Sequence, residues 1–327
     1  MAGAGVVCHA PVSEEHRVNQ RKYGSMTVRV GLGVGANPFE SGKSFFRWVD
    51  LCEGSGVDSI WQSDRLISRE PYLEALSTMA ALAGATQKMR FGMSAVVASL
   101  RDPLLLAKQC ATIDFLSGGR LLPVFGVGAE QAPEWAATGL TPRRRGRRAD
   151  EVLEIIRRLW TEDSVDFDGE FFQYRAARIE PRPVQTPLPL WVGGSSPAAI
   201  ARTARIGTGW LAGIQTPEEV APVVEAIRKA SAQQGRPIPE DHYGATFAYR
   251  FGSDDDPIVS KLNRKRGATT RPGFLVVGQK SEILERIHAY RAAGVSKFVL
   301  IPIAQGDADL MEQTRRLVEE VIPSAEI

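Results

Sequence analysis

Charged residues stand directly after two short apolar runs that are typical of buried strands. Asp64 and Arg65 follow the run VDSIWQS at 57–63, and Glu130 follows LLPVFGVGA at 121–129. A carboxylate can transfer a proton, whereas an arginine stays protonated and can stabilise developing negative charge. The carboxyl ends of parallel strands meet at one face of a barrel, so we expect these three side chains to converge there. Surface ion pairs, a helix cap or an ordinary loop carboxylate are the alternatives.

A third strand-like run ends in Gly193, Gly194 and Ser195 and leads into Ser196-Pro197. Serine is favoured as a helix N-cap and proline as the first helical residue. The free amides of such a helix start bind anions, most naturally a phosphate. An ordinary capped turn is the alternative.

Five arginines crowd into six positions before the amphipathic segment ADEVLEIIRRLW at 149–160. Nucleic-acid binding usually adds interleaved aromatic residues and a wider basic face, which are missing here. With 40 Lys and Arg against 38 Asp and Glu, the net charge of +2 gives no overall basic field either. We therefore expect no nucleic-acid partner, and this run either binds an anionic ligand tail or is a solvated helix start; its members are Arg143, Arg144, Arg145, Arg147 and Arg148.

The elements that must position these residues alternate regularly. Short β-branched runs alternate with stretches whose apolar residues recur at helical spacing, which predicts a parallel sheet. Eight of each is the number that closes a (β/α)8 TIM barrel, an α/β fold. The strands are expected at 28–34, 57–61, 89–98, 120–127, 189–192, 209–212, 245–251 and 297–303, and the helices at about 43–55, 72–85, 103–116, 147–159, 197–205, 217–234, 281–293 and 310–321.

Two stretches interrupt this alternation. Residues 161–185 carry alternating aromatic residues around an Asp-Gly turn signal, which predicts a hairpin-like insertion after the fourth helix. Residues 252–272 are polar and charged and predict a mobile loop after the seventh strand. We expect residues 1–25 to form a flexible tail and 26–327 to form a single barrel domain.

The first strand ends in glycines that formally resemble a dinucleotide-binding fingerprint, Gly31-x-Gly33-x-x-Ala36. That fingerprint must open a helix directly, whereas Asn37-Pro38 predicts a turn. Small residues at the end of a barrel strand instead allow a flat ligand to lie close to the backbone.

Composition excludes several other classes. The three cysteines are odd in number and widely spaced, and no CxxC or HExxH motif occurs, so we expect neither a disulfide framework nor a metal site. No run of about 18 apolar residues occurs, so no membrane-spanning helix is expected. We expect a cytoplasmic protein.

The sequence resembles the luciferase-like flavin oxidoreductase family, the bacterial-luciferase superfamily of (β/α)8 barrels, over residues 27–322. The resemblance is carried by GVDSIWQSDR, RDPLLLAKQCATIDFLSGGRLLPVFGVGAE, VDFDGEFFQY, PLPLWVGGSSPAAIARTARIGTGWL and VVGQKSEILERIHAYRAAGVSKFVL, with Arg145, Arg148 and Glu151 forming RxxRxxE.

The resemblance implies that an isoalloxazine-type ring lies in the mouth of the barrel, from reduced FMN or from the deazaflavin coenzyme F420. It implies a non-prolyl cis peptide behind the ring, here at Ser94-Ala95, and a homodimer acting on a small-molecule substrate. It also implies a set of cofactor-binding residues, which here are Asp64, Ser94, Ala95, Gly128, Arg145, Arg148, Gly193, Gly194 and Ser195.

The sequence departs from the F420-dependent branch at one position. Ser63-Asp64 matches the Ser-Asp-His motif of that branch, but Arg65 replaces the histidine and cannot act as a general base. We therefore expect an F420-dependent oxidoreductase that reduces a C=C or C=N bond, with Arg65 stabilising charge and Glu130 or water supplying the proton. An FMN-dependent monooxygenase and a non-catalytic flavin-binding protein are the alternatives.

Overall fold

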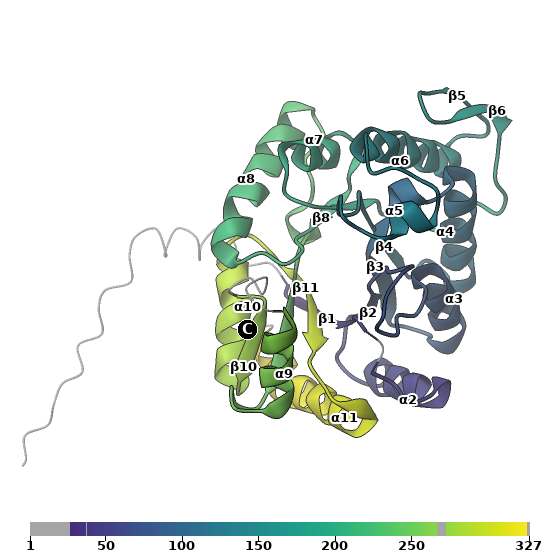
Figure 1. The fold of residues 1–327 in the computed structure, drawn as a ribbon. Coiled ribbons are helices and arrows are strands. Elements are labelled where there is room, and N and C mark those ends of the chain that lie inside the picture. Colours follow the sequence, from purple (N-terminus) through teal and green to yellow (C-terminus); the bar gives the residue numbers. More distant parts are fainter. Residues whose placement is uncertain (1–26, 37, 267–272, 326–327) are drawn as a thin grey trace, which may run out of the picture.

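A computed structural model of the chain describes residues 27–36, 38–266 and 273–325. The predicted tail, residues 1–25, lies outside these ranges, as do Asn37 of the predicted turn and residues 267–272 of the predicted loop. Within the described residues, helices surround a central set of strands (Figure 1).

Eight parallel strands form a closed ring, as the sequence predicts. Each pairs with its neighbours in the order β1-β2-β3-β4-β7-β8-β9-β11, and β11 pairs with β1 to close the barrel. The ring strands are β1 (Arg29–Val34), β2 (Ser59–Gln62), β3 (Arg90–Val97), β4 (Leu121–Gly126), β7 (Trp191–Gly193), β8 (Gly209–Leu211), β9 (Tyr243–Phe251) and β11 (Lys297–Pro302).

The helices follow the strands in alternation. Several begin at a clear N-cap: Asp102 precedes Pro103 in α4, Ser196 precedes Pro197 in α7 and Thr216 precedes Pro217 in α8. The helices are α2 (Gly42–Glu53), α3 (Ala75–Ala85), α4 (Pro103–Ser117), α5 (Glu134–Ala137), α6 (Arg145–Thr161), α7 (Pro197–Ile206), α8 (Pro217–Gln233), α9 (Pro257–Arg266), α10 (Lys280–Ala292), α11 (Gly306–Arg316) and α12 (Ile322–Ala325), with 3₁₀ turns at Ala98–Leu100 and Glu240–His242 and a π-helical turn at Leu317–Val321.

The predicted insertion after the fourth helix is a hairpin. Its strands β5 (Val165–Asp168) and β6 (Gln173–Ala177) are antiparallel and form a separate two-stranded sheet. Figure 1 shows it projecting beside α6.

The prediction of a loop at 252–272 is wrong for about half of its residues, because α9 occupies Pro257–Arg266. Asp256 explains the difference: its side chain accepts a hydrogen bond from Ile258 N at 3.2 Å, and Pro257 is the first helical residue. A ninth strand of this sheet, β10 (Leu275–Gly278), was not predicted. It pairs with the end of β9 beyond the point where β9 pairs with β8.

The barrel interior is filled below its mouth. Successive side chains of a strand point to opposite faces, so Ile60 packs toward the helices while Trp61 points inward. Close packing explains why β3 carries Gly92: a Cβ at this position would lie 2.3 Å from the Leu122 carbonyl oxygen and 2.6 Å from the Trp61 ring. The inward cluster consists of Trp61, Leu122, Val124, Trp191, Leu211 and Val299, with Ala95 packed against it.

The amino ends of the strands carry a buried ion pair between Lys297 and Asp58. Ser59 donates a hydrogen bond to Asp58 Oδ2 at 2.7 Å, and Trp61 Nε1 donates one to Ser59 at 2.8 Å. Burial alone would raise the pKa of the Asp58 carboxyl, but Lys297 outweighs it and the pKa lies below its usual value. The network stabilises the end of the barrel opposite its mouth.

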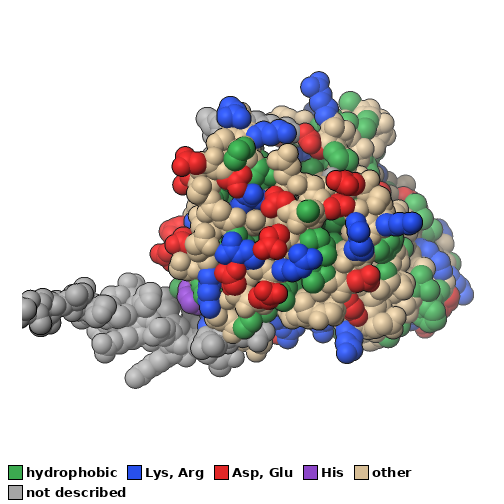
Figure 2. Space-filling model, turned by 90° about the horizontal axis from the view of Figure 1, so that it is seen from below, with side chains coloured by type: hydrophobic (Ala, Val, Ile, Leu, Met, Phe, Trp, Pro, Cys, Tyr) green, Lys and Arg blue, Asp and Glu red, His purple; other side chains and the backbone are tan. Residues whose placement is uncertain are grey.

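On the face seen in Figure 2, acidic and basic side chains are interspersed over the surface. Within the described residues, we find no helix long and apolar enough to cross a lipid bilayer.

Candidate active site at the barrel mouth

Three neighbouring strands end in small residues that face one another. A Cβ placed on Gly126 of β4 would lie 3.7 Å from the Cβ of Ala95, and one placed on Gly193 of β7 would lie 3.9 Å from it. The peptide bond Ser94-Ala95 is cis, which confirms the prediction for this bond. We call Ala95, Gly126 and Gly193 the platform, because these small residues lie side by side on three neighbouring strands. Larger side chains here would fill the space that a planar ligand needs.

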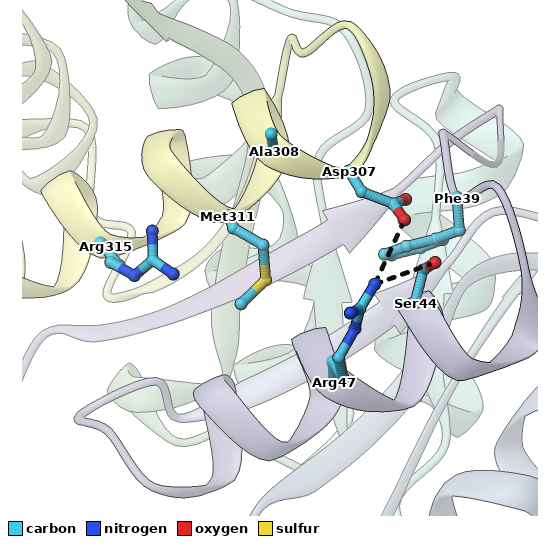
Figure 3. A pocket seen from close by; sticks show the side chains of 7 residues that line it. All are labelled: Phe39, Ser44, Arg47, Asp307, Ala308, Met311 and Arg315. Atoms are coloured by element: carbon cyan, nitrogen blue, oxygen red, sulfur yellow. Dashed lines mark hydrogen bonds and ion pairs between the residues drawn. The ribbon is translucent and has the colours of Figure 1, made fainter.

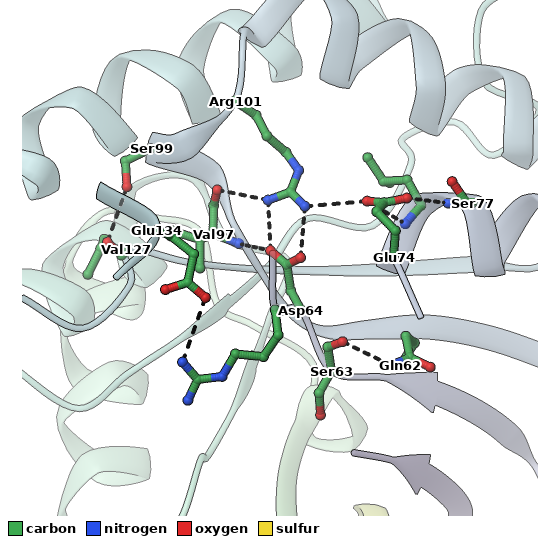
Figure 4. A network of polar contacts seen from close by, with 12 residues as sticks. Gln62, Ser63, Asp64, Glu74, Ser77, Val97, Ser99, Arg101, Val127 and Glu134 are labelled. Atoms are coloured by element: carbon green, nitrogen blue, oxygen red, sulfur yellow. Dashed lines mark hydrogen bonds and ion pairs between the residues drawn. The ribbon is translucent and has the colours of Figure 1, made fainter. Parts of the chain in front are cut away.

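A buried ion pair fixes the strand end beside this platform (Figure 4). Arg101 donates two hydrogen bonds to Asp64, at 2.7 Å to Oδ2 and 2.8 Å to Oδ1, and Val97 N donates a third at 2.9 Å. The Asp64 side chain is only 2% exposed. Its carboxylate is thus fully engaged by the protein, which makes Asp64 a positioning residue for the end of β3 rather than a proton-transfer group.

Arg101 extends this network to the start of α3. Its guanidinium also lies 3.5 Å from Glu74, whose carboxylate caps α3 by accepting hydrogen bonds from Leu76 N and Ser77 N. Burial disfavours the charge of Arg101, but the hydrogen bonds and charge of Asp64 outweigh that effect and raise the pKa of Arg101. Arg101 was not predicted as a site residue, although it lies two residues before Pro103, where the predicted helix at 103–116 begins.

Asp64, Arg65 and Glu130 each contact a different partner in the structure. Arg65 faces Glu134, with 3.7 Å between Nη1 and Oε1, while Glu130 lies 3.3 Å from Arg145. The Glu130 side chain is 63% exposed. The role proposed for Glu130 in proton transfer stays a prediction, and Glu134 is a second carboxylate that sequence analysis missed four residues further on.

The arginine run is engaged mostly by the protein itself. Arg145 donates to the Gly128 carbonyl oxygen at 3.2 Å, and Arg148 donates through Nε to the Ser99 carbonyl oxygen at 3.0 Å. Arg148 also lies over the Phe172 ring at 4.4 Å. Burial lowers the pKa of Arg148. Both arginines therefore tie α6 to the loops that follow β3 and β4, and Nη1 and Nη2 of Arg148 make no hydrogen bond within the described residues.

Glu151 and Gly128 hold two segments of this region in place. Glu151, the acidic end of RxxRxxE, accepts hydrogen bonds from the backbone N–H groups of Glu170, Phe171 and Phe172 and so holds the hairpin turn. Gly128 has a φ of 74°, and a Cβ there would lie 2.8 Å from Val97. The glycine is needed because the loop after β4 packs against the end of β3.

The amino end of α7 offers backbone donors beside the platform. Ser196 caps the helix by accepting a hydrogen bond from Ala199 N at 3.2 Å, and Pro197 has no N–H. Among the described residues, no acceptor binds the amides of Ser195, Ser196 or Ala198. Gly194, with a φ of 102°, turns the chain from β7 into this helix.

A pocket of about 430 Å³ lies elsewhere, between α2 and α11 (Figure 3). Arg47 spans it, 3.7 Å from Asp307 and 3.4 Å from the Ser44 hydroxyl. Its other lining residues, Phe39, Ala308, Met311 and Arg315, also lie outside the platform.

We expect Asp64→Asn to lower the free energy of unfolding by about 3 kcal/mol, because it removes the bidentate counter-charge of the Arg101 guanidinium and leaves only the more distant Glu74. Chemical denaturation measures the loss. The matched control is Asp168→Asn, which removes an exposed partner 3.7 Å from Arg175 and should change stability by less than about 1 kcal/mol. Equal effects of the two substitutions would contradict the role assigned to Asp64.

The chain is similar in sequence to known proteins. Residues 24–272 match the luciferase-like monooxygenase family. The chain is 28% identical over 281 residues to an F420-dependent glucose-6-phosphate dehydrogenase of Kineococcus radiotolerans, covering 81% of this chain and 79% of that protein. It is 35% identical over 225 residues to the pyrimidine monooxygenase RutA of Methylobacterium radiotolerans, covering 62% and 57%.

A solved structure supports the fold. An F420-dependent secondary alcohol dehydrogenase, in complex with an F420-acetone adduct, superposes with a TM-score of 0.80 at 18% identity, covering 92% of this chain and all of that one. The chain is an oxidoreductase, and it belongs to the luciferase-like monooxygenase family.

Proposed function

We propose that the protein is an F420-dependent oxidoreductase that transfers a hydride between the deazaflavin and a small organic substrate, reducing a C=C or C=N bond. The observation that carries this proposal is the platform of Ala95, Gly126 and Gly193, whose small residues would let a planar ring lie close to the backbone near the carboxyl ends of β3, β4 and β7. Active sites of TIM barrels lie at this end of the strands.

The residues around the platform fit such a cofactor. Backbone at Ser94-Ala95 would support the ring from behind, and the free amides of Ser195, Ser196 and Ala198 would bind its phosphate. The two unengaged nitrogens of Arg148 would add positive charge near the anionic tail.

When bound, the reduced deazaflavin supplies a hydride, and the chain's residues supply the rest. Reduction of a substrate double bond by hydride would leave the bond's electron pair on the second atom, which would then need a proton from the chain or from solvent. Arg65 would stabilise the negative charge that develops, because its guanidinium keeps its proton. Glu130 would supply the proton and recover it from solvent, to which it is exposed.

A reduced-FMN-dependent monooxygenase is the second candidate, favoured by the 35% identity to RutA. The relative from Kineococcus radiotolerans matches over a larger share of this chain, 81% against 62%, and supports F420. The platform accepts either ring, so cofactor affinity must decide between them.

We expect F420 to bind at least about tenfold more tightly than FMN, since the proposal takes F420 as the resident cofactor. Fluorescence quenching of each cofactor titrated with protein gives the two dissociation constants. Tighter binding of FMN would overturn the F420 assignment and favour the monooxygenase.

The same titration tests the phosphate position through Ser195, because the positive φ of Gly194 would make any substitution there strained. Ser195→Asp places a carboxylate among the free amides and should weaken binding at least tenfold through repulsion of the phosphate. Ser195→Asn introduces a side chain of nearly the same size as Asp but without its charge, and it should change cofactor affinity little. Equal affinities of the two variants would remove the phosphate from this helix.

We expect Glu130→Gln to lower the rate of cofactor oxidation by about 10²-fold, the low end of general acid catalysis, because water can partly replace an exposed group. Single-turnover experiments with reduced F420 and an enone measure this rate, and the cofactor titration checks that binding is intact. A wild-type rate would show that water, rather than Glu130, delivers the proton.

A further inference from the structure

Glu134 is a buried carboxylate that is only partly satisfied. Its side chain is 6% exposed, and within the described residues its Oε2 is buried without a hydrogen-bond partner. A buried charged oxygen is costly unless a donor or a cation compensates it. The charge of Glu134 is therefore compensated mainly by Arg65. The charge of Glu130 is compensated by water as well as by Arg145, because Glu130 is exposed.

Arg65 is anchored by Glu134 on one side only. The 3.7 Å between Nη1 and Oε1 is an ion pair rather than a hydrogen bond, and the Arg65 side chain is 49% exposed. Its N–H groups make no hydrogen bond within the described residues. Five donors of a guanidinium thus remain available to a ligand.

The pair lies across the end of β3. Arg65 follows β2 and Glu134 follows β4, while β3 pairs with both strands. Trp135, next to Glu134, lies 3.1 Å from a Cβ placed on Gly128, and Val97 lies 2.8 Å from it, so α5 rests on the end of β3. This is the strand that contains the cis peptide Ser94-Ala95 and contributes Ala95 to the platform.

The charges around Arg65 favour an uncharged acceptor. Glu134 already neutralises the guanidinium, and the nearby Arg101 is committed to Asp64 and Glu74. A neutral pair binds an anion weakly but still offers N–H donors to a polarised oxygen. Resting on the proposed function, we propose that Glu134 is a positioning residue that orients Arg65 to bind the carbonyl oxygen of an uncharged substrate.

The test measures binding of two ring-matched probes, cyclohexanone and cyclohexanecarboxylate, by ligand-observed NMR on the full chain with and without F420. We expect wild type to bind the ketone more tightly than the carboxylate. Arg65→Gln and Glu134→Gln should each weaken ketone binding about tenfold while F420 affinity stays the same. The double variant should bind the ketone with about the same affinity as the single variant that binds it less tightly, because the two residues act as one unit.

The matched control is a second ion pair of the same length, Arg315 and Glu312 on α11, also 3.7 Å apart. Arg315→Gln and Glu312→Gln should leave the affinity for both probes unchanged. If Glu134→Gln fails to fold, Arg65→Gln and Arg65→Lys test the proposal instead, because Arg65 is half exposed and its substitution should not prevent folding. Lysine lacks the planar fork of arginine, so Arg65→Lys should bind the ketone as weakly as Arg65→Gln does.

The proposal would be overturned if Arg65→Gln bound the ketone as tightly as wild type, or if wild type did not bind the ketone. It would also be overturned if the effects of Arg65→Gln and Glu134→Gln on ketone affinity were additive in the double variant. Tighter binding of the carboxylate would overturn the uncharged substrate class. Intact ketone binding in a protein that does not bind F420 would overturn the cofactor assignment and leave this inference standing.

Discussion

The mouth of this barrel depends on the buried ion pair between Asp64 and Arg101. Each of these charges would be costly alone in the interior, and their bidentate hydrogen bonds make them mutually dependent. Because Asp64 follows β2 and also accepts a hydrogen bond from Val97 N, the pair fixes the end of β3 against β2. Arg101 also reaches Glu74 and so fixes the start of α3. The cis peptide at Ser94-Ala95 lies in the strand that this network holds.

A second set of contacts holds the other side of the mouth. Arg145 and Arg148 bind carbonyl oxygens in the loops after β4 and β3, and Glu151 holds the hairpin turn through three backbone N–H groups. Arg202 of α7 binds Asp150 at 2.8 Å and so joins α6 to the helix whose amino end offers free amides. The sequence feature RxxRxxE therefore has a structural role, whatever ligand the remaining arginine nitrogens bind.

The sequence predicts the barrel because its signals are local: alternating strand and helix patterns, with caps such as Ser196-Pro197, place all eight ring strands. The hairpin β5–β6 and the cis peptide at Ser94-Ala95 are also confirmed. The helix α9 was missed because its charged composition obscured the Asp256-Pro257 start.

Side-chain partners were harder to predict, since they depend on which loops meet in space. Nothing in the sequence indicates that Asp64 binds Arg101, 37 residues away, or that Arg65 faces Glu134 rather than Glu130. Glu134 stands between Pro133 and Trp135, whereas Glu130 follows Gly128-Ala129, but neither local sequence states which loop it packs against. Their burial differs because Glu134 begins the short helix α5, which packs against the end of β3, whereas Glu130 lies in the exposed turn before it.

The central claim is that this mouth serves hydride transfer from a deazaflavin. The most direct measurement uses reduced F420 that carries deuterium at both hydrogen positions of its hydride-bearing carbon, mixed with the protein and an enone in the absence of oxygen. Mass spectrometry of the product should show one deuterium per reduced C=C bond. A product without deuterium, or turnover that requires oxygen and FMN, would contradict the account.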